Sequence, residues 1–243
     1  MARDDAQELL PQSIISLGDE RQVLDLVAGS IMGLWDVVNE LTRLRPTRRE
    51  RYRVTIFGSA RIPQDHWVYA AVRDVAEELT RLGCDIVTGG GPGLMEAANE
   101  GTKRADPNAA ERSVGIRVQL PFEQNVNAFV TQAYEHRTFF TRLHQFVLMS
   151  DAFVVMPGGI GTLLEATMIW QLLQVGHLQG TPLILVGKMY GELLAWCRDH
   201  MLRPDVPLAN AEDIELPHCV EDGPGVLRIV REHQAAWTAA RNL

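Results

Sequence analysis

The chain has 243 residues, of which 46% are hydrophobic and 22% charged, and its formal net charge is -8 at pH 7. This length suits one large α/β domain with accessory helices. A mean hydropathy of -0.06 and the lack of an apolar run near 18 residues argue against a membrane span. The negative charge argues against bulk binding of nucleic acid, which demands a basic face.

The amino terminus and the cysteines indicate the compartment. The first residues, MARDDAQELLPQS, lack a basic region followed by an apolar core, so no secretory signal is predicted. Cys84, Cys197 and Cys219 are odd in number and form no CxxC pair, which favours neither a disulfide framework nor a zinc site. We therefore expect a cytoplasmic protein without a metal ion or a cofactor.

An amino-terminal segment precedes the first predicted strand. Apolar residues recur at three- and four-residue steps over about 20–44 and predict an amphipathic helix, which Pro46 ends. This helix packs either on the domain or on another subunit. We take residues 1–50 as an N-terminal helical extension and residues 51–243 as one catalytic domain.

A basic run joins the two parts and indicates either an anion-binding patch or a solvated connector balanced by nearby acids. The run consists of Arg43, Arg45, Arg48, Arg49, Arg51 and Arg53.

Strands and helices alternate along the rest of the chain. Strands are predicted at residues 52–57, 84–88, 113–120, 129–134, 152–156 and 182–186. Helices are predicted at residues 65–82, 94–104, 137–149, 190–201 and 224–241, with another that starts at Thr162. The alternation predicts an α/β fold, a Rossmann-like parallel sheet with helices on both faces and accessory helices at both ends.

The stretch 150–174 combines a buried strand, a glycine turn and a helix. Its glycines lack Cβ, so the backbone can approach a ligand closely. Thr162 is predicted to open the helix, whose unpaired amides and dipole favour an anion such as phosphate. Glu165 falls in the first turn of this predicted helix, where the dipole should favour its ionised form. A carboxylate at that place indicates chemistry on a group attached to the phosphate.

Two further glycine turns follow predicted strands, at residues 58–61 and 89–93. Ligands collect at the carboxyl ends of parallel strands, so these turns belong to the same predicted site. The sequence GGGPGL lacks the third glycine of the dinucleotide fingerprint GxGxxG. The Walker pattern fails as well, because Gly187-Lys188 is followed by Met189. Neither an NAD site nor an ATP site is therefore indicated.

Two motifs carry a resemblance to a known family. Residues 89–99, GGGPGLMEAAN, and residues 157–165, PGGIGTLLE, resemble the LOG family of cytokinin riboside 5'-monophosphate phosphoribohydrolases, often labelled lysine decarboxylase-like. The second motif matches the family pattern PGGxGTxxE at every fixed position. The resemblance covers about residues 52–203 and looks closest to the longer bacterial members.

The resemblance implies hydrolysis of the N-glycosidic bond of a nucleoside 5'-monophosphate such as AMP. The products would be ribose 5-phosphate and a free base, either adenine or a cytokinin-type base. The catalytic pair would be Arg142 and Glu165, and the protein would form a homodimer or a larger homo-oligomer. The implied phosphate and ribose contacts are Gly58, Ser59, Gly89, Gly90, Gly91, Gly158, Gly159, Gly161 and Thr162.

The chain departs from the family pattern at two places. Leu143 follows the arginine where the family commonly has lysine, which bears on a second cationic contact to the substrate. Gly58-Ser59-Ala60 stands where shorter members have a second hydroxyl residue, so one phosphate contact is expected to be lost.

The implied chemistry suits the residue types. Breaking the ribosyl bond develops oxocarbenium character at C1', which a carboxylate near the ribose stabilises. Glu165 fits that role, or the role of the base that activates water. Arg142 offers a rigid fork for ribose hydroxyls, for phosphate or for the glutamate itself. The alternatives are that Glu165 serves its helix terminus, and that Arg142 pairs with Asp151 or Glu135 on the surface.

Three more residues are candidate substrate contacts. Met95 and Glu96 open the helix after the second glycine turn, and Gln171 lies about two turns along the central helix. Glu96 could instead favour its helix terminus, and Gln171 could be polar helix surface. Asn99 either contacts the ligand or caps its helix locally.

Two other functions were weighed. A pyridoxal phosphate decarboxylase needs a lysine for the Schiff base. Lys103 lies late in a helix and Lys188 has no evident acidic partner, so this activity is not expected. The second alternative is a non-catalytic carrier of a nucleotide or a molybdenum-type cofactor on the same fold. Arg142 and Glu165 favour the enzyme, because a carrier has no need of the pair.

Overall fold

The computed structural model describes residues 19–41, 50–108, 112–118 and 126–241, and it divides the chain into two units, 1–47 and 48–243. The described part of the first unit contains the helix α1 (Glu20–Leu41), which agrees with the predicted helix. The last predicted residues of that helix, 42–44, lie outside the described residues. None of the described helices is long and apolar enough to cross a membrane.

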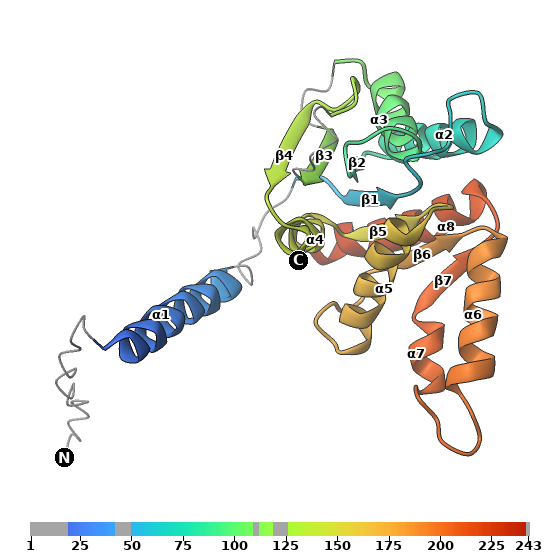
Figure 1. The fold of residues 1–243 in the computed structure, drawn as a ribbon. Coiled ribbons are helices and arrows are strands. Elements are labelled where there is room, and N and C mark those ends of the chain that lie inside the picture. The colour runs from blue at the N-terminus through green and yellow to red at the C-terminus, as the bar shows by residue number, and fades with distance from the viewer. Residues whose placement is uncertain (1–18, 42–49, 109–111, 119–125, 242–243) are drawn as a thin grey trace, which may run out of the picture. The chain divides into compact units, whose positions relative to one another are not determined.

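The second unit alternates strands and helices as predicted (Figure 1). Its elements are β1 (Arg53–Phe57), α2 (Trp67–Arg81), β2 (Asp85–Thr88), α3 (Leu94–Ala105), β3 (Ser113–Val118), β4 (Gln132–His136), α4 (Phe139–Met149), β5 (Ala152–Val155), α5 (Ile160–Gln174), β6 (Leu183–Val186), α6 (Lys188–Met201), α7 (Ala211–Glu215), β7 (Pro217–Val220) and α8 (Gly223–Arg241).

The seven strands form one parallel sheet in the order β4-β3-β2-β1-β5-β6-β7. The chain builds outward from β1 to β4, and then returns to the other side of β1 with β5. Strand order therefore reverses between β1 and β5, where Val54 lies opposite Ala152 and Phe57 opposite Val155. Ligands of open α/β sheets bind at the carboxyl ends of the strands at such a reversal. The predicted Rossmann-like parallel sheet is confirmed.

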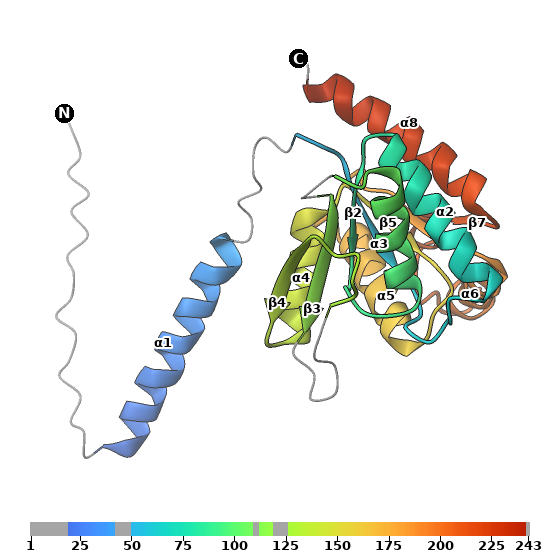
Figure 2. The same ribbon diagram turned by 90° about the horizontal axis from the view of Figure 1, so that it is seen from above.

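Helices cover both faces of the sheet because its strands are buried on both sides. Val54 and Ile56 of β1 belong to a core that includes residues of α2, α3 and α8. Phe57 and Phe153 belong to a second core, with residues of α4, α5 and α6. The carboxyl-terminal helix α8 runs along α2, as Figure 2 shows.

Differences from the prediction concern short edge elements. β4 covers residues 132–136 and not 129–134, because the apolar pair Phe129-Val130 belongs to a turn held by Asn127. The side-chain Oδ1 of Asn127 accepts from the Phe129 amide at 3.1 Å, and the backbone carbonyl of Asn127 accepts from the Val130 amide at 3.3 Å. The short elements α7 and β7 were not predicted, because neither shows a repeat of apolar residues.

Part of the arginine run is paired with a buried acid. Asp85 begins β2 and is 2% exposed, and its carboxylate lies 2.6 Å from Arg51 Nε and 3.5 Å from Arg53 Nε. Arg112 Nε lies 3.7 Å from the same carboxylate. The connector interpretation is thus confirmed for Arg51 and Arg53. The other four arginines of the run lie outside the described residues.

Candidate active site

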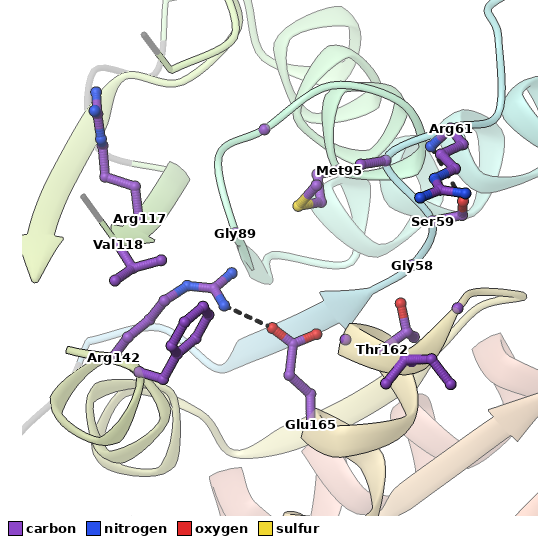
Figure 3. Close-up of a pocket in the computed structure, with 16 residues that line it drawn as sticks. Gly58, Ser59, Arg61, Gly89, Met95, Arg117, Val118, Arg142, Thr162 and Glu165 are labelled. Atoms are coloured by element: carbon purple, nitrogen blue, oxygen red, sulfur yellow. Dashed lines mark hydrogen bonds and ion pairs between the residues drawn. The ribbon is translucent and has the colours of Figure 1, made fainter. Parts of the chain in front are cut away.

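A hollow of about 470 Å³ lies at the carboxyl ends of the central strands (Figure 3). The turns after β1 and β2, the end of β3, the first turns of α4 and the start of α5 enclose it. Most of the predicted site residues line it. They are Gly58, Ser59, Gly89, Gly91, Met95, Arg142, Gly159, Gly161, Thr162 and Glu165.

The helix α5 begins at Ile160, two residues before the predicted start. Gly159 is its cap residue, and the Gly159 carbonyl accepts the first helical hydrogen bond from the Leu163 amide at 2.9 Å. Glu165 therefore lies in the second turn, and the prediction that it lies in the first turn was wrong. The influence of the helix dipole falls off within the first turn.

Glu165 and Arg142 form an ion pair at the centre of the hollow. Arg142 Nη1 lies 2.9 Å from Glu165 Oε1, and the two side chains are 12% and 11% exposed. The alternative surface pairings of Arg142 with Asp151 or Glu135 are not the ones formed. The arginine and the glutamate reach each other from α4 and α5, helices on the same face of the sheet (Figure 3).

Two contacts fix the orientation of Arg142. Its Nε donates to the carbonyl of Ile116 in β3 at 2.9 Å, and its guanidinium carbon lies 5.1 Å from the centre of the Phe146 ring. At the start of α4, the Thr138 hydroxyl accepts from the Thr141 amide at 3.2 Å. With Nε and one face of the guanidinium so engaged, the terminal nitrogens point toward Glu165 and the hollow.

Burial raises the pKa of Glu165, and the charge and hydrogen bond of Arg142 lower it only in part. The net direction is opposite to the one expected from the helix dipole, because Glu165 is buried and lies in the second turn. Tyr190 of α6 is a buried neighbour, and its hydroxyl donates to the Met156 carbonyl at 2.9 Å. Burial together with the charge of Glu165 raises the pKa of Tyr190 to about 12.

The turn before α5 leaves its backbone open toward the hollow. A Cβ at Gly159 or Gly161 would meet no atom within 4 Å, so packing within the chain requires neither glycine. A glycine inside a helix lowers helix stability by about 1 kcal/mol relative to alanine. Gly161 has room for a Cβ, so helix stability does not explain the glycine there. Gly158 differs, because a Cβ there would collide with the Thr162 side chain. The first amides of α5 have no partner within the helix and can bind an anion.

The turn after β2 approaches Arg142 closely. A Cβ at Gly89 would lie 2.5 Å from Arg142 Nη2 and 2.6 Å from Met95 Sδ, so only glycine leaves room for both side chains. Gly90 has a φ of 71° and donates its amide to the Thr88 hydroxyl at 3.0 Å. Gly90 supports the turn and does not line the hollow.

Asn99 is a buried link between elements. Its Oδ1 accepts from the Thr88 hydroxyl at 2.7 Å and from Asn127 Nδ2 at 3.0 Å, and its Nδ2 donates to the Ser113 hydroxyl at 2.8 Å. Asn127 Nδ2 also donates to the Gly91 carbonyl at 3.0 Å. Asn99 therefore neither caps its helix nor lines the hollow, but connects β2, β3 and the glycine turn.

Two predicted contacts lie elsewhere. The Glu96 carboxylate accepts from Gln64 Nε2 at 3.2 Å and does not line the hollow. Gln171 Nε2 donates to Gln174 Oε1 at 3.0 Å beside a second, apolar hollow between α5, α6 and α7. A role of Glu96 or Gln171 in binding substrate stays a prediction.

Six lining residues were not predicted: Ala60, Arg61, Arg117, Val118, Phe139 and Ile160. Arg61 lies in the turn after β1, and Arg117 and Val118 end β3. Position at or shortly after the carboxyl end of a strand was the signal that could have identified these three. Arg117 Nη2 lies 3.4 Å from Glu135 Oε1 on the neighbouring strand. Among the described residues, no group of three or more His, Cys, Asp or Glu side chains could hold a metal ion.

The sheet order and the glycine turns at its carboxyl edge define the chain as a Rossmann-like α/β protein. It belongs to the LOG family, because the family model described as "Possible lysine decarboxylase" matches residues 95–230. A curated relative, the probable cytokinin riboside 5'-monophosphate phosphoribohydrolase LOGL9 of Oryza sativa subsp. japonica, is 32% identical over 148 residues. This match covers 59% of the chain but only 63% of the relative.

Solved structures share the fold at low identity. The molybdenum cofactor binding protein of Rippkaea orientalis is 17% identical with a TM-score of 0.56, over 77% of this chain and 98% of that one. The Moco carrier protein of Chlamydomonas reinhardtii is 19% identical with a TM-score of 0.55, over 77% of this chain and 99% of that one. Likeness at this level concerns the fold alone.

Proposed function

We propose that the protein is a nucleoside 5'-monophosphate phosphoribohydrolase, which hydrolyses the N-glycosidic bond and releases a free base and ribose 5-phosphate. The observation that carries the proposal is the buried pair of Arg142 and Glu165, 2.9 Å apart, in one hollow with a helix amino terminus. Membership of the LOG family and the printed activity of the rice relative support it.

The hollow suggests how such a nucleotide lies. The phosphate binds at the start of α5, where the open glycines and unpaired amides favour an anion. The ribose then lies over Glu165, about one helical turn farther along α5. The base extends toward Gly89 and Met95, on the other side of the ion pair. The phosphate is the remote handle that orients the sugar for reaction.

Glu165 acts on the water that attacks the sugar. As the water oxygen bonds to C1', a water proton passes to the carboxylate, and the bond between C1' and the base nitrogen breaks. The electron pair of that bond leaves with the base, which takes up a proton from solvent, and Glu165 then returns the water proton to solvent. Negative charge on Glu165 also stabilises the oxocarbenium character of C1'. A raised pKa makes this carboxylate a stronger base than an ordinary glutamate.

Arg142 positions the glutamate and the sugar. One nitrogen is committed to Glu165 and one to the Ile116 carbonyl, which leaves Nη2 for a ribose hydroxyl. The side chain is held from both sides, so little of its freedom is lost when substrate binds.

The proposal for which base is released rests on the rice relative. We propose adenine or a cytokinin-type base as the leaving group, with AMP as the simplest substrate, because the printed name of the rice protein is of that kind. We place the reaction in the cytoplasm, where the free thiols of Cys84, Cys197 and Cys219 persist.

We further propose a homodimer that buries the outer side of α5. This helix carries apolar residues on all sides, yet Ile160, Leu164 and Val175 along it are 84%, 49% and 54% exposed. Such a helix is normally covered on every side. Phe140 at the start of α4 is a further exposed apolar side chain, at 78%.

The proposed activity is tested with pure protein and a panel of nucleoside 5'-monophosphates, with released base detected by chromatography. Glu165→Gln should abolish release and keep affinity for ribose 5-phosphate, because the isosteric amide accepts no proton. Glu192→Gln is the matched control, since Glu192 lies exposed on α6 in a surface pair with Lys188. If no nucleotide yields base while binding is measurable, the protein is a carrier and the proposal is wrong.

A further inference from the structure

The charged side chains that line the hollow are Arg61, Arg117, Arg142 and Glu165. Arg142 pairs with Glu165, and Arg117 pairs with Glu135. Arg61 differs from them: it is exposed, and its guanidinium has no ionic or hydrogen-bonding partner within residues 50–108, 112–118 and 126–241. A charged side chain that makes no ion pair or hydrogen bond within the described residues and lines a hollow is a candidate for ligand binding.

The backbone holds Arg61 firmly in place. Its amide donates to the Ser59 hydroxyl oxygen at 3.1 Å. The Ser59 amide donates to the Pro157 carbonyl at 3.1 Å, and the Ser59 carbonyl accepts from the Leu94 amide at 2.9 Å. The turn after β1 is thus tied both to the turn before α5 and to the start of α3. Figure 3 shows the Arg61 side chain beside Ser59, across the hollow from Thr162.

A phosphate ester carries more negative charge than the helix amino terminus can neutralise. Such an ester carries about -1.5 to -2 charges at pH 7. The amino terminus of α5 contributes roughly +0.5. Arg142 and Glu165 neutralise each other, so they add little net charge at this end of the hollow. With Arg61 the positive charge near the phosphate rises to about +1.5.

The side chain of Arg61 suits a phosphate ester, because a guanidinium fork can donate two parallel, charge-assisted hydrogen bonds to phosphate oxygens.

We infer that Arg61 is the cationic clamp for the substrate's 5'-phosphate, and that it selects the doubly ionised phosphate monoester over the unphosphorylated nucleoside. This inference rests on the proposed function. It identifies the residue that recognises the phosphate, whereas Arg142 and Glu165 act on the ribosyl bond.

The test is calorimetric titration of the full chain with ribose 5-phosphate between pH 5 and 8. Affinity of the unchanged protein should rise with pH through about 6, where the second phosphate proton is lost. Arg61→Ala should weaken binding at pH 8 by tenfold or more and should flatten that rise. Arg61→Lys should recover part of the affinity, because it keeps the charge but not the fork. Arg231→Ala on α8, another exposed arginine, should bind as the unchanged protein does.

Binding by Arg61→Ala within twofold of the unchanged protein, with the same pH dependence, would overturn the inference. A uniform loss at every pH, with a lowered melting temperature, would also overturn it by giving Arg61 a structural role. The experiment is independent of catalysis. If the protein binds ribose 5-phosphate through Arg61 but releases no base, only the proposed activity fails; if it releases base without needing Arg61, only this inference fails.

Discussion

Two opposing effects act on the pKa of Glu165, a buried carboxylate beside a single arginine. Burial disfavours the charged form of Glu165, and Arg142 favours it, with burial the larger effect. The carboxylate therefore binds a proton more strongly than an exposed glutamate. This is the property that a base for water activation needs at neutral pH.

The raised pKa of Glu165 predicts the acid side of the pH profile. The ionised form is the active one, so kcat should be full above the pKa of the bound enzyme and lost as pH falls through it. Because burial raises that pKa above the ordinary 4.5, the decline should set in above pH 4.5. Initial rates at saturating nucleotide from pH 4 to 8 measure it. A kcat that stays constant down to pH 4.5 would contradict the role of Glu165.

The close approach of Gly89 to Arg142 gives a second prediction at this scale. Gly89→Ala places a methyl group 2.5 Å from Arg142 Nη2 and should displace the guanidinium from Glu165. We expect a loss of kcat of about tenfold to a hundredfold, because small misplacements of a catalytic group are costly.

Gly191→Ala on α6, away from the hollow, is the matched control for this substitution. Its methyl group would meet only Cys219 Sγ, at 4.0 Å. Rates for both variants are compared at equal melting temperature. Equal rates for the two would mean that the position of Arg142 is not limiting.

Single residues also show where sequence reasoning stops. Arg142 and Glu165 lie 2.9 Å apart. The PGGxGTxxE motif contains Glu165 alone, and Arg142 was placed by the resemblance to the family, so the motif by itself did not predict the pair. Arg61 and Arg117 were missed, because a position near the end of a strand does not show which side chains face a ligand until the sheet brings the strand ends together. Asn99 was ambiguous, because its partners Ser113 and Asn127 lie on later elements.

At the scale of elements, long periodic segments were predictable and short edge elements were not. The buried strands β1, β2, β5 and β6 are runs of apolar or β-branched residues, which the sequence displays directly. β4 (QAYEH) and β7 (PHCV) are edge strands with mixed residues, so only pairing with their neighbours defines them. The start of α5 was misplaced because Ile160-Gly161 is a weak local signal for a helix.

The link made by Asn99 predicts how the elements depend on one another. Asn99→Ala leaves the buried hydroxyls of Thr88 and Ser113 without their amide partner. We expect the free energy of unfolding to fall by about 1–3 kcal/mol, the cost of unsatisfied buried polar groups. Urea unfolding measures it, with Gln64→Ala as an exposed control. A change below about 0.5 kcal/mol would show that the network adds nothing to stability.

At the scale of the whole second unit, the two ends of the central strands carry different groups of charged residues. The Asp85 cluster, with Arg51, Arg53 and Arg112, lies at the amino ends of β1 and β2. The candidate active site lies at the carboxyl ends of the same strands. The charged residues at the amino ends of the strands pair with Asp85, whereas charged residues at the carboxyl ends line the hollow.

The exposed side of α5 gives a prediction for assembly. Sedimentation of the unchanged protein should give twice the chain mass of 27.1 kDa. Val175→Lys should weaken self-association by tenfold or more, because a buried charge is costly. Val206→Lys is the control, since Val206 is equally apolar and 62% exposed on the loop after α6. A monomer for the unchanged protein, or equal association for both variants, would contradict the proposed interface.

The central claim, hydrolysis of the N-glycosidic bond, is tested most directly by determining which bond of AMP is broken. AMP is incubated with the protein in water enriched in oxygen-18, and the products are analysed by mass spectrometry. Attack of water on C1' predicts one labelled oxygen in ribose 5-phosphate, an equal amount of adenine, and neither product with Glu165→Gln. Label in inorganic phosphate, or bound AMP that is never cleaved, would contradict the account.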